Sequence, residues 1–137
     1  MNTDSDKQPP QVSAPLGTTD ILIVDDNADI RLLVRTMVGA GLKIAEASSG
    51  QEAWDMVLQL RPRLVLLDVM MPGTLNGLQV LSAIRQSTET SATKVVVVTG
   101  RAGPEDLRNA RRHEADGYLT KPFSVQDIQS LVQTFLR

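Results

Sequence analysis

Short apolar runs alternate along the chain with segments in which apolar side chains recur at helical spacing. The runs are rich in valine, isoleucine and leucine, which is typical of strands buried on both faces. They predict strands at 21–24, 43–47, 64–68, 95–99 and around 118–119. A chain that alternates strands with helices in this way predicts an α/β fold, with a parallel sheet covered on both faces.

The intervening segments place apolar residues three and four positions apart, as in a helix with one buried face. Gly39 and Gly41 are expected to end the first helix and Pro62 the second, because glycine and proline interrupt helices. Further helices are predicted over 77–86, over 104–112 and after residue 123. This (βα)₅ pattern predicts the flavodoxin-like doubly wound sheet with strand order 2-1-3-4-5.

The first 19 residues follow neither pattern. They contain three prolines and almost no large apolar side chains, so they bury too little surface to offset the entropy lost on ordering. We therefore expect a flexible N-terminal tail over 1–19 and one folded domain over 20–137.

Composition excludes several classes of function. Aromatic residues make up 3% of the chain and the net charge is −2, which argues against direct binding of nucleic acid. Cysteine is absent, so disulfides and thiolate chemistry are excluded. No apolar run approaches the length needed to cross a bilayer, and the N-terminus lacks a signal-peptide core. These observations predict a cytoplasmic protein that is not inserted in a membrane.

Chemically informative side chains follow the predicted strands. Asp25 and Asp26 follow the first strand, Asp68 ends the third, Thr99 ends the fourth and Lys121 follows the fifth. In open α/β sheets ligands bind outside the carboxyl ends of the strands, so these side chains are expected to meet at one edge.

Three neighbouring carboxylates repel one another unless a cation compensates them. Mg²⁺ prefers carboxylate and water oxygens and commonly bridges to phosphate, with Mn²⁺ as an alternative ion. A lysine ammonium adds a second positive charge, and one carboxylate can act as a nucleophile toward phosphorus. The set therefore predicts phosphoryl transfer. The chain lacks the GxxxxGK[ST] pattern of P-loop nucleotide binders.

The segments ILIVDDN, LVLLDVMMPG, VVVVTG and GYLTKPF, in this order, make the sequence similar to the receiver domain of two-component response regulators, of the single-domain chemotaxis-regulator kind. The match spans residues 21–123, and the final helix extends it to about 136. The resemblance implies that a histidine kinase or histidine phosphotransfer protein is the phosphoryl donor. It also implies a switched surface made by the fourth helix, fifth strand and fifth helix, with a phosphorylation-dependent homodimer as one outcome.

The resemblance assigns a role to each matching residue. The assignments are Asp68 as phosphoacceptor; Asp25, Asp26, Asp68 and the Met70 carbonyl as metal ligands; Lys121 as the partner of Asp68 and later of the phosphoryl group; Thr99 and Tyr118 as switch residues; and Met70 and Arg101 as residues that tune dephosphorylation. A bulky Met70 and a long Arg101 side chain predict slow self-hydrolysis. The Lys121–Pro122 bond is expected to be cis. The loop after Asp68 is one residue longer than the commonest family form.

Simpler interpretations accompany each assignment. Asp25, Asp26 and Asn27 also suit a helix N-cap, which we expect Asn27 to form. Lys121, Thr99 and Tyr118, taken singly, would be ordinary surface or strand-end residues. His113 receives no role, and Trp54 is assigned to packing.

Two other functions stay open from the sequence. One is a degenerate receiver that serves as a docking or dimerisation module. The other is an Asp-nucleophile phosphatase, although such enzymes separate their two aspartates by one intervening residue after the first strand. Here Asp25 and Asp26 are adjacent, and the candidate nucleophile Asp68 follows the third strand. A receiver is a signalling module and not an enzyme with an external substrate. Only one helix is predicted after residue 123, so the chain is either a stand-alone regulator or a fragment of a larger one.

Overall fold

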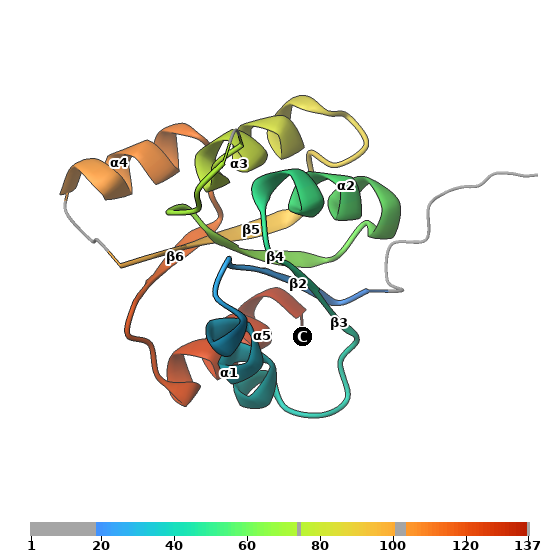
Figure 1. Ribbon diagram of the computed structural model, residues 1–137, viewed down its shortest axis with the longest axis vertical. Coiled ribbons are helices and arrows are strands. Elements are labelled where there is room, and N and C mark those ends of the chain that lie inside the picture. Colours follow the sequence, from blue (N-terminus) through green and yellow to red (C-terminus); the bar gives the residue numbers. More distant parts are fainter. Residues whose placement is uncertain (1–18, 74, 101–103, 137) are drawn as a thin grey trace, which may run out of the picture.

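The computed structural model describes residues 19–73, 75–100 and 104–136. Strands and helices alternate throughout these ranges (Figure 1). In chain order they are β2 (Ile21–Val24), α1 (Ala28–Val38), β3 (Ile44–Ala47), α2 (Gly50–Leu60), β4 (Leu64–Asp68), α3 (Gly77–Gln86), β5 (Lys94–Thr99), α4 (Pro104–Arg112), β6 (Gly117–Thr120) and α5 (Val125–Leu136).

The strands form one parallel sheet in the order β3-β2-β4-β5-β6. This is the predicted 2-1-3-4-5 order, and the α/β prediction is confirmed. The register pairs Val24 with Leu67, Asp68 with Val98 and Thr99 with Thr120. Because the strands are parallel and in step, the residues that follow them meet at one edge of the sheet.

Helices cover the two faces of the sheet in unequal numbers (Figure 1). α1 and α5 pack on one face, where Ile21 and Ile23 of β2 point. α2, α3 and α4 cover the other, where Leu22 and Val24 point. Alternate residues of one strand therefore enter different cores, and this explains why the central runs are apolar at every position.

The first two helices end close to the glycine and proline residues that predicted their ends. α1 ends at Val38, and Gly39 caps it with a φ of 84°, a conformation that glycine adopts without a steric penalty. α2 ends at Leu60, one residue earlier than Pro62 alone requires. Its C-cap is Arg61, which takes the left-handed conformation at φ 48° and donates its backbone N–H to the Val57 carbonyl.

The predicted tail over residues 1–19 lies outside the described residues except for Thr19. Thr19 is buried, and its carbonyl accepts a hydrogen bond from the Arg63 backbone at 3.3 Å. The folded domain therefore includes Thr19.

Candidate functional site

The turn after β2 presents two aspartates with different exposures. Asp25 is 3% exposed, whereas Asp26 faces solvent. The Asp25 Oδ1 accepts the Asn27 backbone N–H at 2.9 Å. Asn27 in turn caps α1, because its side chain accepts the N–H groups of Asp29 and Ile30. The expected cap at Asn27 is confirmed, and the cap helps to fix the direction of the acidic turn.

Asp68 is the last residue of β4 and is 3% exposed. Its Oδ1 accepts the Met70 backbone N–H at 2.9 Å. Ligand oxygens of Asp25, Asp26 and Asp68 all lie within 4.8 Å of one another. The sheet register thus brings together the three acids that the sequence singled out.

Lys121 bridges two of these acids. Its Nζ donates to the Asp25 Oδ2 at 2.8 Å and lies 3.5 Å from the Asp68 Oδ2. The Lys121–Pro122 peptide is cis, as predicted. The Lys121 backbone N–H donates to the Thr99 carbonyl at 2.8 Å, which ties the end of β6 to the end of β5.

The charges shift the protonation of both partners in this ion pair. Burial raises the pKa of Asp68 and the negative charge of Asp25 adds to the rise, while the Met70 N–H and Lys121 only partly oppose them. Burial by itself would lower the pKa of Lys121, but its hydrogen bond to Asp25 and the charges of both acids outweigh this and raise it. Lys121 is therefore fully protonated near neutral pH, and a further cation at this site would favour the ionised form of Asp68.

The raised pKa of Asp68 predicts that its ionisation opposes folding. A carboxyl that holds its proton more tightly when folded stabilises the fold at low pH, and that contribution is lost as pH rises through the folded pKa. We expect Asp68→Asn to increase the free energy of unfolding by about 1 kcal/mol at pH 7 without divalent cations. The gain should shrink toward the ordinary pKa of aspartate, where Asp68 is protonated in both states.

Urea titrations with a chelator at several pH values measure this effect. Asp55→Asn, on the exposed side of α2, is the matched control and should change stability little at any pH. An Asp68→Asn protein that is less stable than the wild type at pH 7 would contradict the argument.

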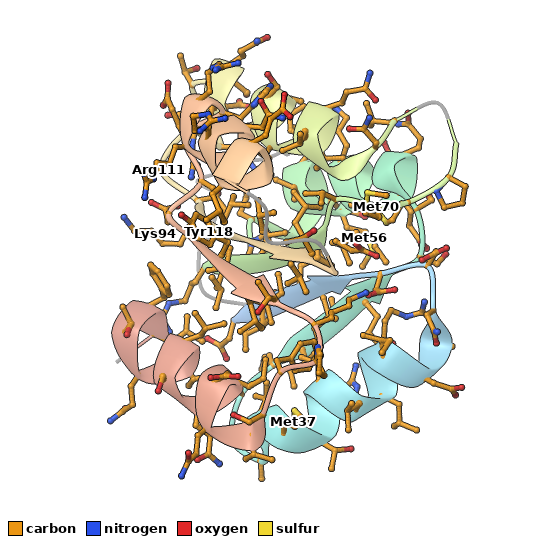
Figure 2. The ribbon with its side chains drawn as sticks, turned by 90° about the vertical axis from the view of Figure 1, so that its left-hand side faces the viewer. Met37, Met56, Met70, Lys94, Arg111 and Tyr118 are labelled. Carbon is orange, nitrogen blue, oxygen red and sulfur yellow. The ribbon has the colours of Figure 1, made fainter. Side chains whose placement is uncertain are left out.

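Thr99 and Tyr118 lie on either side of a small cavity beneath α4. Thr99 is 4% exposed at the end of β5. Both residues line this cavity together with Val69, which follows β4, and with residues of α3, β5 and α4. Figure 2 shows Tyr118 at the β6 edge of the sheet with Arg111 of α4 above it, and the Arg111 Nη2 donates to the Tyr118 hydroxyl at 3.4 Å. The switch roles of Thr99 and Tyr118 stay predictions.

Of the two residues expected to tune dephosphorylation, the structure describes only Met70. Met70, two residues after Asp68, is 59% exposed, and its tuning role stays a prediction. Arg101 lies outside the described residues. Trp54 is partly buried against the core between α2 and the sheet, which supports its assignment to packing.

The donor set fits a hard divalent cation. Three carboxylates converge, Lys121 is the one cation that pairs with them among the residues that the structure describes, and Asp26 is exposed to solvent. Oxygen ligands with access to water are what Mg²⁺ requires. Asp25, Asp26 and Asp68 would hold the ion, and the Met70 carbonyl is the predicted fourth ligand.

Sequence reasoning missed two residues that shape the site. The Arg31 Nη1 donates to the Asp25 backbone carbonyl at 2.7 Å, although Arg31 lies on the polar side of α1 in the helical pattern. Gly77 presses against the Asp68 carbonyl, so that a Cβ atom at Gly77 would overlap it. The periodicity of α1 carries no signal for the first contact, and the helix-starting glycine gave only a hint of the second.

Three acids lie at the carboxyl edge of a five-stranded parallel sheet, and the lysine that contacts two of them precedes a cis-proline. Among flavodoxin-like proteins, this arrangement is that of receiver domains. Sequence comparison agrees. The family model for the response regulator receiver domain matches residues 21–133, and the chain belongs to this family.

Several relatives and one solved structure illustrate the similarity. The transcriptional regulatory protein ResD of Bacillus subtilis is 38% identical over 122 residues, covering 87% of this chain and 48% of ResD. The DNA-binding response regulator MtrA of Mycobacterium tuberculosis is 35% identical over 118 residues, covering 85% of this chain and 50% of MtrA. The chemotaxis protein CheY4 of Vibrio cholerae superposes with a TM-score of 0.79 at 28% identity, covering 86% of this chain and 98% of CheY4.

The chain spans about half the length of the curated relatives it matches. Within the described ranges, no helix is both long and apolar enough to cross a membrane.

Proposed function

We propose that this protein is a phosphorylation-controlled receiver in which Asp68 accepts a phosphoryl group from a phosphohistidine. The donor would be a histidine kinase or a histidine phosphotransfer protein. The observation that carries the proposal is the convergence of three carboxylates within 4.8 Å around a lysine that contacts both Asp25 and Asp68. A docking module without chemistry would not need a buried, destabilised acid at this position.

The reaction needs positioning and charge neutralisation more than covalent assistance. An Asp68 carboxylate oxygen attacks phosphorus in line with the leaving imidazole. The new bond joins oxygen to phosphorus, while the phosphorus–nitrogen bond breaks and its electron pair stays on the imidazole. Mg²⁺, when bound, supplies positive charge to the phosphoryl oxygens. Lys121 is long enough to leave Asp68 and pair with the transferred group, while Asp25 keeps the ammonium near the site.

The product carries about two negative charges near pH 7, in place of the single charge of the Asp68 carboxylate, and it lies beside Asp25 and Asp26. Thr99 and Tyr118 line the same cavity, so a Thr99 hydroxyl drawn toward the phosphoryl group would change the space open to Tyr118. We infer that this change alters the surface of α4, β6 and α5. MtrA is named a DNA-binding response regulator, and this chain covers only 50% of it. In our proposal, the output of this chain is a protein contact.

The test is stoichiometric labelling with a small phosphodonor such as acetyl phosphate or phosphoramidate in the presence of Mg²⁺. We expect the intact mass to rise by one phosphoryl group, in an adduct that acid or hydroxylamine treatment removes. Chelation of Mg²⁺ and Asp68→Asn should each abolish the gain, because the first removes the neutralising charge and the second removes the nucleophile.

Other results would point elsewhere. A mass gain that persists in Asp68→Asn would contradict the assignment of the acceptor. No gain with small donors or with phosphorylated histidine phosphotransfer proteins would favour a docking module. Sustained turnover of a generic phosphate ester would favour a phosphatase.

A further inference from the structure

Arg31 connects α1, β3 and the acidic turn through one guanidinium group. Its Nε donates to the Glu46 Oε1 at 2.9 Å and its Nη1 donates to the Asp25 carbonyl at 2.7 Å. The Arg31 side chain is only 17% exposed. A planar guanidinium held at two points has little freedom to move, so its contact with Asp25 is fixed by Glu46.

Glu46 is itself fixed by a second arginine. The Arg35 Nε donates to the Glu46 Oε2 at 2.8 Å, so each carboxylate oxygen has its own guanidinium partner. Burial alone would raise the pKa of Glu46, but the hydrogen bonds and charges of Arg35 and Arg31 outweigh it and lower the pKa. Glu46 therefore stays ionised and holds Arg31 in place throughout the neutral range.

Every polar group of Asp25 has a partner. Its N–H donates to the Ala47 carbonyl at 3.1 Å, its Oδ1 accepts from the Asn27 backbone and its Oδ2 accepts from Lys121 at 2.8 Å. The remaining group, the carbonyl oxygen, accepts from Arg31. This carbonyl belongs to the peptide that joins Asp25 to Asp26, so Arg31 fixes the plane of the peptide between the two candidate metal ligands.

We propose that Arg31 is a positioning residue for the cation site, which orients the Asp25–Asp26 peptide through a guanidinium anchored on Glu46. This inference rests on the function proposed above. It predicts that loss of Arg31 weakens divalent-cation binding and phosphorylation even where the fold survives, because hydrogen-bond partners of metal-binding groups set their direction.

Arg35 provides a matched control. It binds the same carboxylate as Arg31, lies one turn later on the same helix and is more exposed, at 43% against 17%. Its side chain donates to Glu46 and to the Ile44 carbonyl at 3.4 Å, and within the described ranges it makes no hydrogen bond to the acidic turn. Replacing either arginine removes half of the Glu46 ion pair, but only the Arg31 replacement frees the Asp25 carbonyl.

The experiment compares wild type, Arg31→Met, Arg31→Lys and Arg35→Met. Mg²⁺ affinity is measured by titration of backbone amide resonances and Mn²⁺ affinity by electron paramagnetic resonance, alongside urea unfolding and the rate of labelling by phosphoramidate. We expect Arg31→Met to weaken Mg²⁺ and Mn²⁺ binding about tenfold, and Arg35→Met to change it less than about twofold. Arg31→Lys, which reaches Glu46 or Asp25 but not both, should fall between them.

The outcomes separate this inference from the function on which it rests. Equal cation affinities for wild type and both Arg31 variants would overturn the inference alone, and so would equal losses in Arg31→Met and Arg35→Met. A wild-type protein that neither binds Mg²⁺ nor accepts a phosphoryl group would overturn the proposed function and the inference together. If Arg31→Met unfolds, Arg31→Lys supplies the comparison with Arg35→Met.

Discussion

Replacing Gly77 by alanine is expected to lower the free energy of unfolding by about 3 kcal/mol and to disturb the acceptor site. Gly77 is the buried first residue of α3. A Cβ atom there would overlap the Asp68 carbonyl oxygen and meet the Val69 Cα, both of which are backbone atoms. Backbone cannot turn aside as a flexible side chain does, so either α3 or the end of β4 must shift.

The consequences of this shift extend beyond stability. Asp68 is held between its strand and the Met70 N–H, so movement of its peptide redirects the carboxylate. Urea unfolding, the amide resonances of Asp68 and Met70, and Mg²⁺-dependent labelling measure the three effects. Gly100→Ala is the control, since a Cβ there meets nothing within 4 Å, and we expect its stability to stay close to that of wild type. A Gly77→Ala protein as stable as Gly100→Ala would contradict the steric argument.

Replacing Arg85 by methionine is expected to lower the free energy of unfolding by a similar amount, about 3 kcal/mol. Arg85 acts at the edge of the sheet opposite to the acids. The Arg85 side chain is 12% exposed and satisfies four acceptors at once. Its Nε donates to the Glu114 carbonyl, its Nη1 to the carbonyls of Ser91 and Thr93, and its Nη2 to the Asp116 Oδ2 at 2.6 Å. One guanidinium thus joins the end of α3 to the segments that precede β5 and β6.

The loss of Arg85 would leave these acceptors without their donor. The Asp116 carboxylate also accepts the Val95 N–H at 2.8 Å, so a charge with only the exposed Lys94 as its cation partner would remain at the start of β5. Lys94→Met is the control, because the Lys94 Nζ lies 3.9 Å from the same carboxylate on a side chain that is 53% exposed. An exposed pair of this kind contributes about 0.5 kcal/mol or less.

Urea and thermal unfolding of both variants give the comparison. Equal stability losses in Arg85→Met and Lys94→Met would show that the buried hydrogen bonds add nothing to the ion pair. Cation binding should change little in either variant, because their contacts lie at the edge of the sheet away from Asp25 and Asp68.

Much of the fold was predictable because its central strands are buried on both faces. The runs 21–24, 64–68 and 95–99 had to be strands of a parallel sheet once helical segments separated them, and the sheet has the predicted order. The edge strands gave weaker signals. β3 is mostly half-buried, and in β6 only Leu119 is buried, so their sequences carry less of the apolar pattern.

The sequence alone determined which side chains stand at the carboxyl ends of the strands. Parallel pairing leaves those ends at one edge, so Asp25, Asp68, Thr99 and Lys121 had to lie near one another in any sheet of this order. Charge and residue type then made cation binding and phosphoryl transfer the predicted chemistry of this edge.

The tertiary structure alone decided what holds these side chains in position. Arg31 donates to the Asp25 carbonyl and to Glu46 on the neighbouring strand at the same time, and Gly77 leaves room for the Asp68 peptide, against which α3 begins. Arg85 likewise binds carbonyls from segments distant in sequence. Such contacts depend on distances between backbone atoms of different elements, which neither apolar periodicity nor motif spacing encodes.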